Sequence, residues 1–139
     1  MTEDLRLDHL RGIVMRAPGI TATTPFYTDQ WGLHVAHKGD GITYLRGTGD
    51  EPFIYGLKDD ATYGIEYIHF GMPDRDGIDA LYRQLSEKGA DLRGAPGVFE
   101  GPFGGYGFEV VDPDNRRLRI TADIPQRDAD EVHAYPGKI

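Results

Sequence analysis

The feature that most constrains this sequence is a repeated order of local signals. A short apolar strand runs into a proline-containing turn and then into a helix that closes on a glycine, and this order occurs twice. The first copy spans residues 12–33, and the second begins at Gly64 and closes its helix on Gly89. Two copies of one β-α-β unit predict a pseudo-symmetric domain whose ligand site lies between the copies.

In the first copy, residues 13–15 form an apolar run that is typical of a strand. Pro25 fits only the first turn of a helix, where its missing N–H has no intrahelical partner, so we predict a short helix that ends near Trp31. The candidates for its N-cap are Thr21, Thr23 and Thr24. Three antiparallel strands are then expected, over residues 33–37, 42–46 and 52–57.

The second copy has a clearer helix signal. Asp76 can cap a helix whose apolar residues recur at helical spacing, namely Ile78, Leu81, Tyr82 and Leu85. Glycines are frequent over residues 94–107, which predicts a flexible rim around a strand near residues 98–99. A phosphate loop is excluded there, because a strand follows where a helix N-terminus would be needed. Two strands joined by a turn at residues 112–115 close the fold, over residues 108–111 and 118–121.

Composition limits the number of domains and the kinds of partner. The 139 residues, 39% of them hydrophobic, suit one domain, which we place at residues 1–124, with a linker-like tail at residues 125–139. The net charge of −8 argues against nucleic acid or an anionic membrane as a partner. Cysteine is absent, which excludes disulfides and thiolate metal sites. Signal-peptide and membrane-span patterns are absent as well, so we expect a cytoplasmic location.

Two stretches carry a resemblance to a known family: Phe26-Tyr-Thr-Asp-Gln-Trp-Gly-Leu33 and Asp112-Pro-Asp-Asn115. They resemble the vicinal oxygen chelate superfamily of glyoxalases, bleomycin-resistance proteins and extradiol dioxygenases. Residues 32–46 are also similar to the first, non-catalytic domain of a two-domain extradiol catechol dioxygenase. The resemblance implies an α+β fold with two β-α-β-β-β modules that form a U-shaped mixed sheet around a cavity, with the helices outside. The modules span residues 8–58 and 64–123.

Metal-binding members of this family place a histidine on the first strand of each half and a glutamate on the last strand. The matching residues here are Gly12, Tyr67 and Arg119. A glycine has no ligand atom, a neutral phenol is a poor ligand and a guanidinium repels a cation, so we expect no metal in this chain. One alternative stays open, in which His9 in a shifted register joins His69, although a carboxylate ligand would still be missing.

Several polar side chains are candidates for lining the cavity. We name Tyr55, Tyr67, His69 and Arg119 as ligand-binding candidates, and His69 and Tyr67 as the only candidates for catalysis. His69 has apolar neighbours in the sequence, which equally suits a core histidine. Arg119 shares a strand face with Arg117 and could bind a carboxylate or pair with the excess acids. If the register is right, Tyr67, His69 and Arg119 point into one concave face and are neighbours.

Four further aromatic and histidine side chains are considered as cavity residues. Phe53 and Trp31 could line an apolar ligand pocket or simply belong to the core. His34 and His37 are expected at the surface, in the strand that follows the first helix.

The resemblance leaves two main functional hypotheses, because a third, a lyase or isomerase of glyoxalase type, needs the metal ligands. The first is the metal-free, non-catalytic N-terminal half of an aromatic-ring-cleaving extradiol dioxygenase, an oxidoreductase of aromatic compound catabolism. Fe(II) is then expected only in a second, catalytic domain, whose first strand would start near residues 136–139, and this chain alone has no catalysis. The second is a free-standing dimeric small-molecule binding protein similar to the bleomycin-resistance proteins. The expected partners are a small aromatic or cationic molecule and a second copy or second domain of the same kind.

Overall fold

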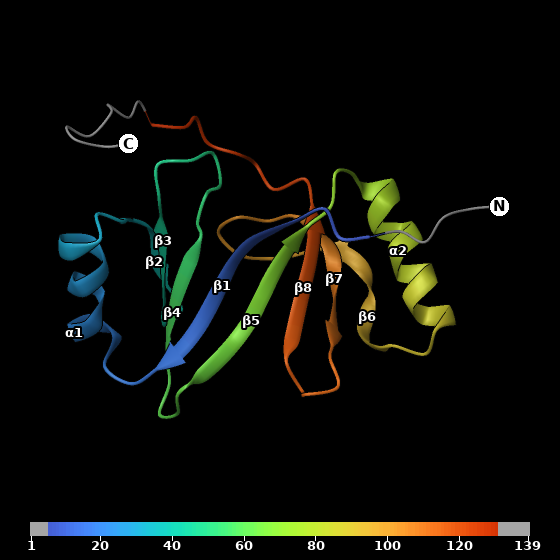
Figure 1. The fold of residues 1–139 in the computed structure, drawn as a ribbon, viewed down its shortest axis with the longest axis horizontal. Helices are drawn as coiled ribbons and strands as arrows, with labels where there is room; N and C mark the ends of the chain where they lie inside the picture. The colour runs from blue at the N-terminus through green and yellow to red at the C-terminus, as the bar shows by residue number, and fades with distance from the viewer. Residues whose placement is uncertain (1–5, 131–139) are drawn as a thin grey trace, which may run out of the picture.

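The computed structural model describes residues 6–130, which form one curved eight-stranded mixed sheet with two helical segments (Figure 1). The first module consists of β1 (His9–Ala17), α1 (Ile20–Pro25), the π-helical turn η1 (Phe26–Gln30), β2 (His34–Gly39), β3 (Ile42–Arg46) and β4 (Tyr55–Asp59). The second consists of β5 (Gly64–Gly71), α2 (Arg75–Glu87), β6 (Asp91–Val98), β7 (Tyr106–Val111) and β8 (Arg117–Ala122). The predicted α+β fold of two β-α-β-β-β modules is confirmed. The expectation for residues 136–139 lies outside the described residues.

Both modules arrange their strands in the same order. The first strand of each module pairs parallel with its last strand, β1 with β4 and β5 with β8, and the other neighbours within a module are antiparallel. Antiparallel pairing of β1 with β5 joins the modules. The sheet order is therefore β2-β3-β4-β1-β5-β8-β7-β6, with the junction of the two modules at its centre.

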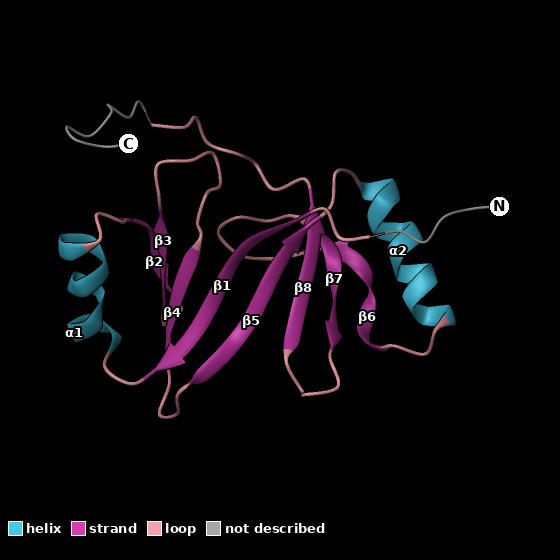
Figure 2. Ribbon diagram, in the orientation of Figure 1, coloured by secondary structure: helices cyan, strands magenta, loops and turns pink. Residues whose placement is uncertain are grey.

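The two faces of the sheet bury different side chains. On the outer face, α2 packs over module two around Ile78 and Phe108, and α1 packs over module one around Ile20 and Leu57 (Figure 2). Successive side chains of a strand point to opposite faces, so their neighbours point to the inner face. A third apolar cluster lies there, made of Val14, Tyr44, Phe53 and Tyr67. The inner face is thus the place for a ligand site.

Helix α2 has the predicted apolar face but a different start. Ile78 and Leu81 are buried, as the spacing predicts. The prediction of Asp76 as N-cap is wrong, because Asp74 occupies that position and its carboxylate accepts a hydrogen bond from the Gly77 N–H at 2.8 Å. The extended backbone of Asp74 suits an N-cap, whereas Asp76 lies in the first turn, where its charge still favours the helix dipole.

Helix α1 also begins earlier than predicted. Gly19 is its N-cap, and the threonines do not cap it, since Thr24 instead donates its hydroxyl hydrogen to the Ile20 carbonyl at 2.7 Å. Pro25 therefore ends α1 and does not lie in the first turn. A proline cannot donate to the carbonyl four residues before it, which agrees with the change to π-helical η1 directly afterwards. Within residues 6–130, no helix is long and apolar enough to cross a membrane.

Strand β3 has its predicted bounds, whereas the other predicted strands differ from theirs, β4 and β6 among them. Strand β4 starts at Tyr55 and continues to Asp59, because it extends its pairing with β1 beyond the predicted end. Strand β6 covers Asp91–Val98 rather than the neighbourhood of residues 98–99. Its pairing with β7 shifts register between Arg93 and Gly97, so the glycine-rich segment contains a bulged strand followed by a loop.

The described part of the tail contacts the loop between β3 and β4, above which it runs in Figure 1. The Arg127 N–H donates to the Asp50 carbonyl at 2.8 Å, and the Asp130 N–H donates to the Thr48 carbonyl at 2.7 Å. A linker-like composition did not predict this attachment to module one.

We still expect removal of residues 125–139 to lower the melting temperature by less than about 10 °C. These hydrogen bonds lie at the surface and are each worth about 0.5–1.5 kcal/mol, which the entropy of ordering the backbone offsets. Thermal unfolding of the full chain and of two truncations, after residue 124 and after residue 130, measures the effect. The longer truncation product keeps the contacts and is the control. A larger fall for the shorter product alone would show that residues 125–130 are part of the domain.

Candidate functional site

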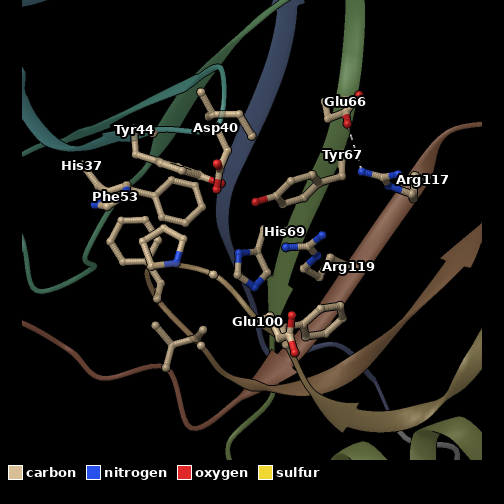
Figure 3. A pocket seen from close by; sticks show the side chains of 18 residues that line it. His37, Asp40, Tyr44, Phe53, Glu66, Tyr67, His69, Glu100, Arg117 and Arg119 are labelled. Atoms are coloured by element: carbon tan, nitrogen blue, oxygen red, sulfur yellow. Dashed lines mark hydrogen bonds and ion pairs between the residues drawn. The ribbon is translucent and has the colours of Figure 1, made fainter.

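A cavity of about 270 Å³ opens on the inner face where the two modules meet (Figure 3). Strands β5 and β8 form its floor, and the β2–β3 hairpin and the loop at residues 99–104 line its sides, in contact with each other where Phe103 packs against Tyr44. Its position agrees with the site expected between the two copies of the repeat. Ligand pockets usually enclose roughly 300–1,000 Å³, so this cavity suits a small ligand of about one ring.

The floor of the cavity brings together Tyr67, His69 and Arg119. The Arg119 guanidinium lies 4.1 Å from the centroid of the Tyr67 ring, and the centroids of the Tyr67 and His69 rings are 6.0 Å apart. His69 and Arg119 are register partners on β5 and β8. The predicted grouping of these three side chains on one concave face is confirmed, and their role in ligand binding stays a prediction.

His69 is buried, with 3% of its surface exposed, and its Nε2 lies 2.7 Å from the Thr121 hydroxyl. Burial lowers the pKa of His69 to about 3, and the positive charge of Arg119 acts in the same direction. The imidazole is therefore neutral near neutral pH. A base with so low a pKa has little driving force to accept a proton, so this environment favours hydrogen bonding over general-base catalysis.

Tyr67 is also held neutral. Burial raises the pKa of its phenol well above the usual value, while the adjacent Arg119 opposes this shift only in part. Its hydroxyl is therefore available as a hydrogen-bond group and is not a phenolate ligand for a metal.

Glu66 binds three cations at one end of the cavity. Its carboxylate accepts hydrogen bonds from Lys58 at 2.8 Å, from Arg117 at 3.2 Å and from Arg16 at 3.4 Å. Burial alone would raise the pKa of Glu66, but the three cations together hold it below the usual value. One carboxylate is thus shared among three positive charges.

Glu109 on β7 is the second carboxylate of this network. It accepts a hydrogen bond from Arg119 Nε at 2.9 Å, and it lies 3.4 Å from Arg117 Nε without hydrogen-bond geometry. The inner face therefore carries an ion-pair ladder of two carboxylates and four cations, with an excess of two positive charges in a protein of net charge −8. The cations are Arg16, Lys58, Arg117 and Arg119. Sequence reasoning identified Arg117 and Arg119 but missed Arg16, Lys58, Glu66 and Glu109.

Three aromatic rings line the wall opposite Arg119. Phe53 lies 4.8 Å from Tyr44 and 4.9 Å from Phe103 between ring centroids. Phe53 was a candidate from the sequence, whereas Tyr44 and Phe103 were not. The alternation of inward and outward side chains along β3 could have identified Tyr44 from the sequence. Phe103 lies in the glycine-rich loop, where no periodicity indicates the direction of a side chain. His37 is exposed at the rim of the same wall, in agreement with its expected surface position.

Tyr55 is not brought into the cavity. It points to the outer face, where its hydroxyl oxygen lies 3.2 Å from that of Tyr27 and the two rings are 5.0 Å apart. The alternation of β4 explains this placement, because Leu57 points the same way and is buried under α1. Trp31 lies on the same side and is 65% exposed. Both residues are therefore separate from the Tyr67, His69 and Arg119 group.

The residues of the cavity do not fit a divalent metal. At two of the three positions that the resemblance matches to metal ligands, Tyr67 presents a neutral phenol and Arg119 a guanidinium. A Cβ atom at Gly12 would lie 2.7 Å from the Ile54 carbonyl oxygen, so a side chain there would need backbone movement. His9, the alternative ligand, lines a different pocket at the start of β1. Within the described part of the chain, no group of three or more His, Cys, Asp or Glu side chains is placed to hold a metal ion.

Several solved structures are similar to this one. They include a Mn(II)-bound glyoxalase from Novosphingobium aromaticivorans, with a TM-score of 0.86 and 24% identity, covering 92% of this chain and 43% of that chain. A homoprotocatechuate 2,3-dioxygenase from Brevibacterium fuscum, in complex with 3,4-dihydroxyphenylacetate, has a TM-score of 0.78 and 16% identity, covering 92% and 41%. The homoprotocatechuate 2,3-dioxygenase from Arthrobacter globiformis has a TM-score of 0.77 and 16% identity, covering 88% and 38%.

No protein-family model and no curated protein matches the sequence. This chain spans less than half the length of the solved structures to which it is similar. At these identities the similarity establishes the arrangement of the backbone, and the resemblance first noted at residues 26–33 and 112–115 agrees with it. The chain therefore has the paired β-α-β-β-β fold of the vicinal oxygen chelate superfamily, which glyoxalases and extradiol dioxygenases share.

Proposed function

We propose that this chain is a metal-free, non-catalytic module of an extradiol dioxygenase-like protein, equivalent to the N-terminal half of an aromatic-ring-cleaving enzyme. The observation that carries the proposal is the Arg119 guanidinium 4.1 Å from the Tyr67 ring. The resemblance matches these two residues to a carboxylate ligand and a histidine ligand of the metal-binding family members. A fixed positive charge at that place opposes a divalent cation. In this proposal Fe(II) belongs only to a second, catalytic domain.

Pairing with a second module is part of the proposal. Strand β2 is an edge strand, and every residue in it except Ala36 is exposed. An uncovered edge has unpaired backbone N–H and C=O groups, which another chain or domain can cover. The coverage of less than half of each similar structure supports a partner of the same kind, either a second domain or a second copy.

The alternative, a free-standing dimer that binds a cationic molecule, has less support from the cavity. Its acidic side chains Asp40 and Glu100 lie exposed at the rim, while the arginines lie at the floor. A cytoplasmic location stays a prediction.

The proposal predicts that the purified chain binds no divalent metal tightly and consumes no catechol. Elemental analysis of untagged protein, followed by anaerobic titration with Fe(II) and Mn(II), measures the first. Oxygen uptake with catechol measures the second. We expect less than about 0.1 equivalent of metal after dialysis, because no carboxylate of the cavity is free of cation partners except those at the rim.

The control is the His69→Ala variant. One equivalent of metal in the wild type that is lost in this variant would show that His69 is a ligand, and the proposal would be wrong. Catechol consumption without metal would also contradict it, and would assign an activity to His69 and Tyr67.

A further inference from the structure

The first observation concerns an unsatisfied hydrogen-bond donor on His69. Thr121 is fully buried, and within residues 6–130 its hydroxyl has one hydrogen-bond partner, Nε2 of His69. A hydroxyl has a hydrogen to donate, so both groups are satisfied when Thr121 donates and Nε2 accepts. The proton of the neutral imidazole is then on Nδ1, which is buried and has no partner among the described residues.

A buried donor without an acceptor is destabilising, which favours a ligand that brings an acceptor. The His69 ring lines the cavity and projects into it in Figure 3. The missing partner is thus a hydrogen-bond acceptor that enters from the cavity.

The second observation concerns the edge of the Arg119 guanidinium. Its Cζ atom lies 4.1 Å from the centroid of the Tyr67 ring and 4.4 Å from that of the Phe99 ring. Its Nε donates to Glu109, and its two terminal nitrogens make no hydrogen bond within the described residues. Two rings and one carboxylate therefore position the guanidinium, while its terminal nitrogens stay available. A planar fork of this kind matches the two oxygens of a carboxylate.

The third observation is the sign of the charge at the floor. The ion-pair ladder has an excess of two positive charges, and its carboxylates Glu66 and Glu109 are already bound to cations. The carboxylates of Asp40 and Glu100 are exposed at the rim, where water screens them. An anion at the floor gains from this excess, whereas a cation does not.

The wall opposite Arg119 sets the shape of the ligand. Tyr44, Phe53 and Phe103 present ring surfaces to a space of about 270 Å³. Aromatic walls at this spacing favour a flat ring, and the volume allows about one.

We propose that the cavity binds a small aromatic carboxylate without any metal, with the carboxylate between the Arg119 guanidinium and Nδ1 of His69 and the ring against Phe53 and Phe103. This site goes beyond the proposed function, since it needs neither catalysis nor a second domain. It also reverses the sign of the ligand charge expected from the acidic composition, because the ion-pair ladder lies at the floor whereas the acids at the rim and on the surface are exposed to water.

Calorimetric titration of the full chain with benzoate, benzyl alcohol and benzylammonium tests the site. Salt near 0.15 M shortens the screening length to about 8 Å and suppresses the effect of the surface acids. We expect benzoate to bind at least about tenfold more tightly than benzyl alcohol, because a charge-assisted hydrogen bond is worth that factor or more. Benzylammonium should bind more weakly than either.

Two variants and a matched control locate the binding. Arg119→Gln removes the fork, and His69→Phe removes the Nδ1 donor but keeps a ring. Each should weaken benzoate about tenfold or more. Arg83→Gln makes the same change of charge as Arg119→Gln, at an exposed position on α2, and should bind benzoate as the wild type does. Melting curves verify that each variant is folded.

A readout on the wild type keeps the proposal testable if a variant does not fold. Nitrogen-15 spectra should show His69 protonated at Nδ1 in the free protein, and that signal should move when benzoate binds. A proton on Nε2, a preference for benzylammonium, or equal binding of benzoate and benzyl alcohol would overturn the proposal. The metal and catechol measurements do not depend on any of these results, so the two proposals can fail separately.

Discussion

Lowering the pH from 7 to 5 should reduce the free energy of unfolding by about 2 kcal/mol through His69 alone. The pKa of His69 is lowered to about 3 in the folded protein, against a usual value of 6.5. Above pH 6.5, His69 is neutral in both the folded and the unfolded state, so its titration does not change the free energy of unfolding. Below pH 6.5, His69 binds a proton in the unfolded chain but stays neutral in the folded protein. The free energy of unfolding therefore falls by about 1.4 kcal/mol per pH unit until the pH approaches 3.

Urea unfolding at pH 7, 6 and 5 measures this loss. The His69→Phe variant is the control, because other ionisable groups titrate alike in both proteins and the difference isolates His69. The variant leaves the Thr121 hydroxyl unpaired, which adds a cost that does not depend on pH. A difference between the two proteins that stays constant from pH 7 to pH 5 would show that His69 is not held neutral by burial.

The second large effect is expected for Phe108→Ala, which should lower the free energy of unfolding by about 3–5 kcal/mol. Phe108 is 1% exposed and packs edge-on against Tyr82 of α2, with ring centroids 5.3 Å apart. Its removal leaves a cavity between α2 and the sheet that the rigid neighbours cannot fill. Denaturant unfolding measures the loss, and the melting temperature should fall by roughly 10–25 °C.

Tyr63→Ala is the matched control, because it also removes one aromatic ring but at a position that is 79% exposed. We expect it to change stability by no more than about 0.5 kcal/mol. A loss below about 1 kcal/mol for Phe108→Ala would mean that α2 does not depend on this contact. The effect matters for the site, since β7 and β8 carry Glu109 and Arg119 next to this core.

Part of the candidate site could be predicted because it depends on local rules. Residues two apart on a strand share a face, which places Tyr67 beside His69 once β5 is recognised. The family resemblance then placed β8 beside β5, and with it Arg119. The same alternation holds for β4, but no local signal indicates which of its faces meets a helix. Tyr55 was therefore predicted in the cavity, whereas it lies on the outer face. The capping residue Asp74 was missed for a similar reason: two aspartates lie near the start of α2, and the backbone conformation selects between them.

The sequence by itself determined the repeat, and with it two β-α-β-β-β modules, one amphipathic helix and a cavity between the copies. The absence of cysteine and the residues at the positions that the resemblance matches to metal ligands also led to the prediction of a metal-free chain, which the elemental analysis tests. Only the tertiary structure decided the electrostatics of that cavity. Glu66 meets Lys58, Arg16 and Arg117 across three other strands, and such contacts depend on strand order and register, which are long-range. The same packing buries His69 against Thr121, 52 residues further along the chain, and leaves its Nδ1 buried without a hydrogen-bond partner among residues 6–130.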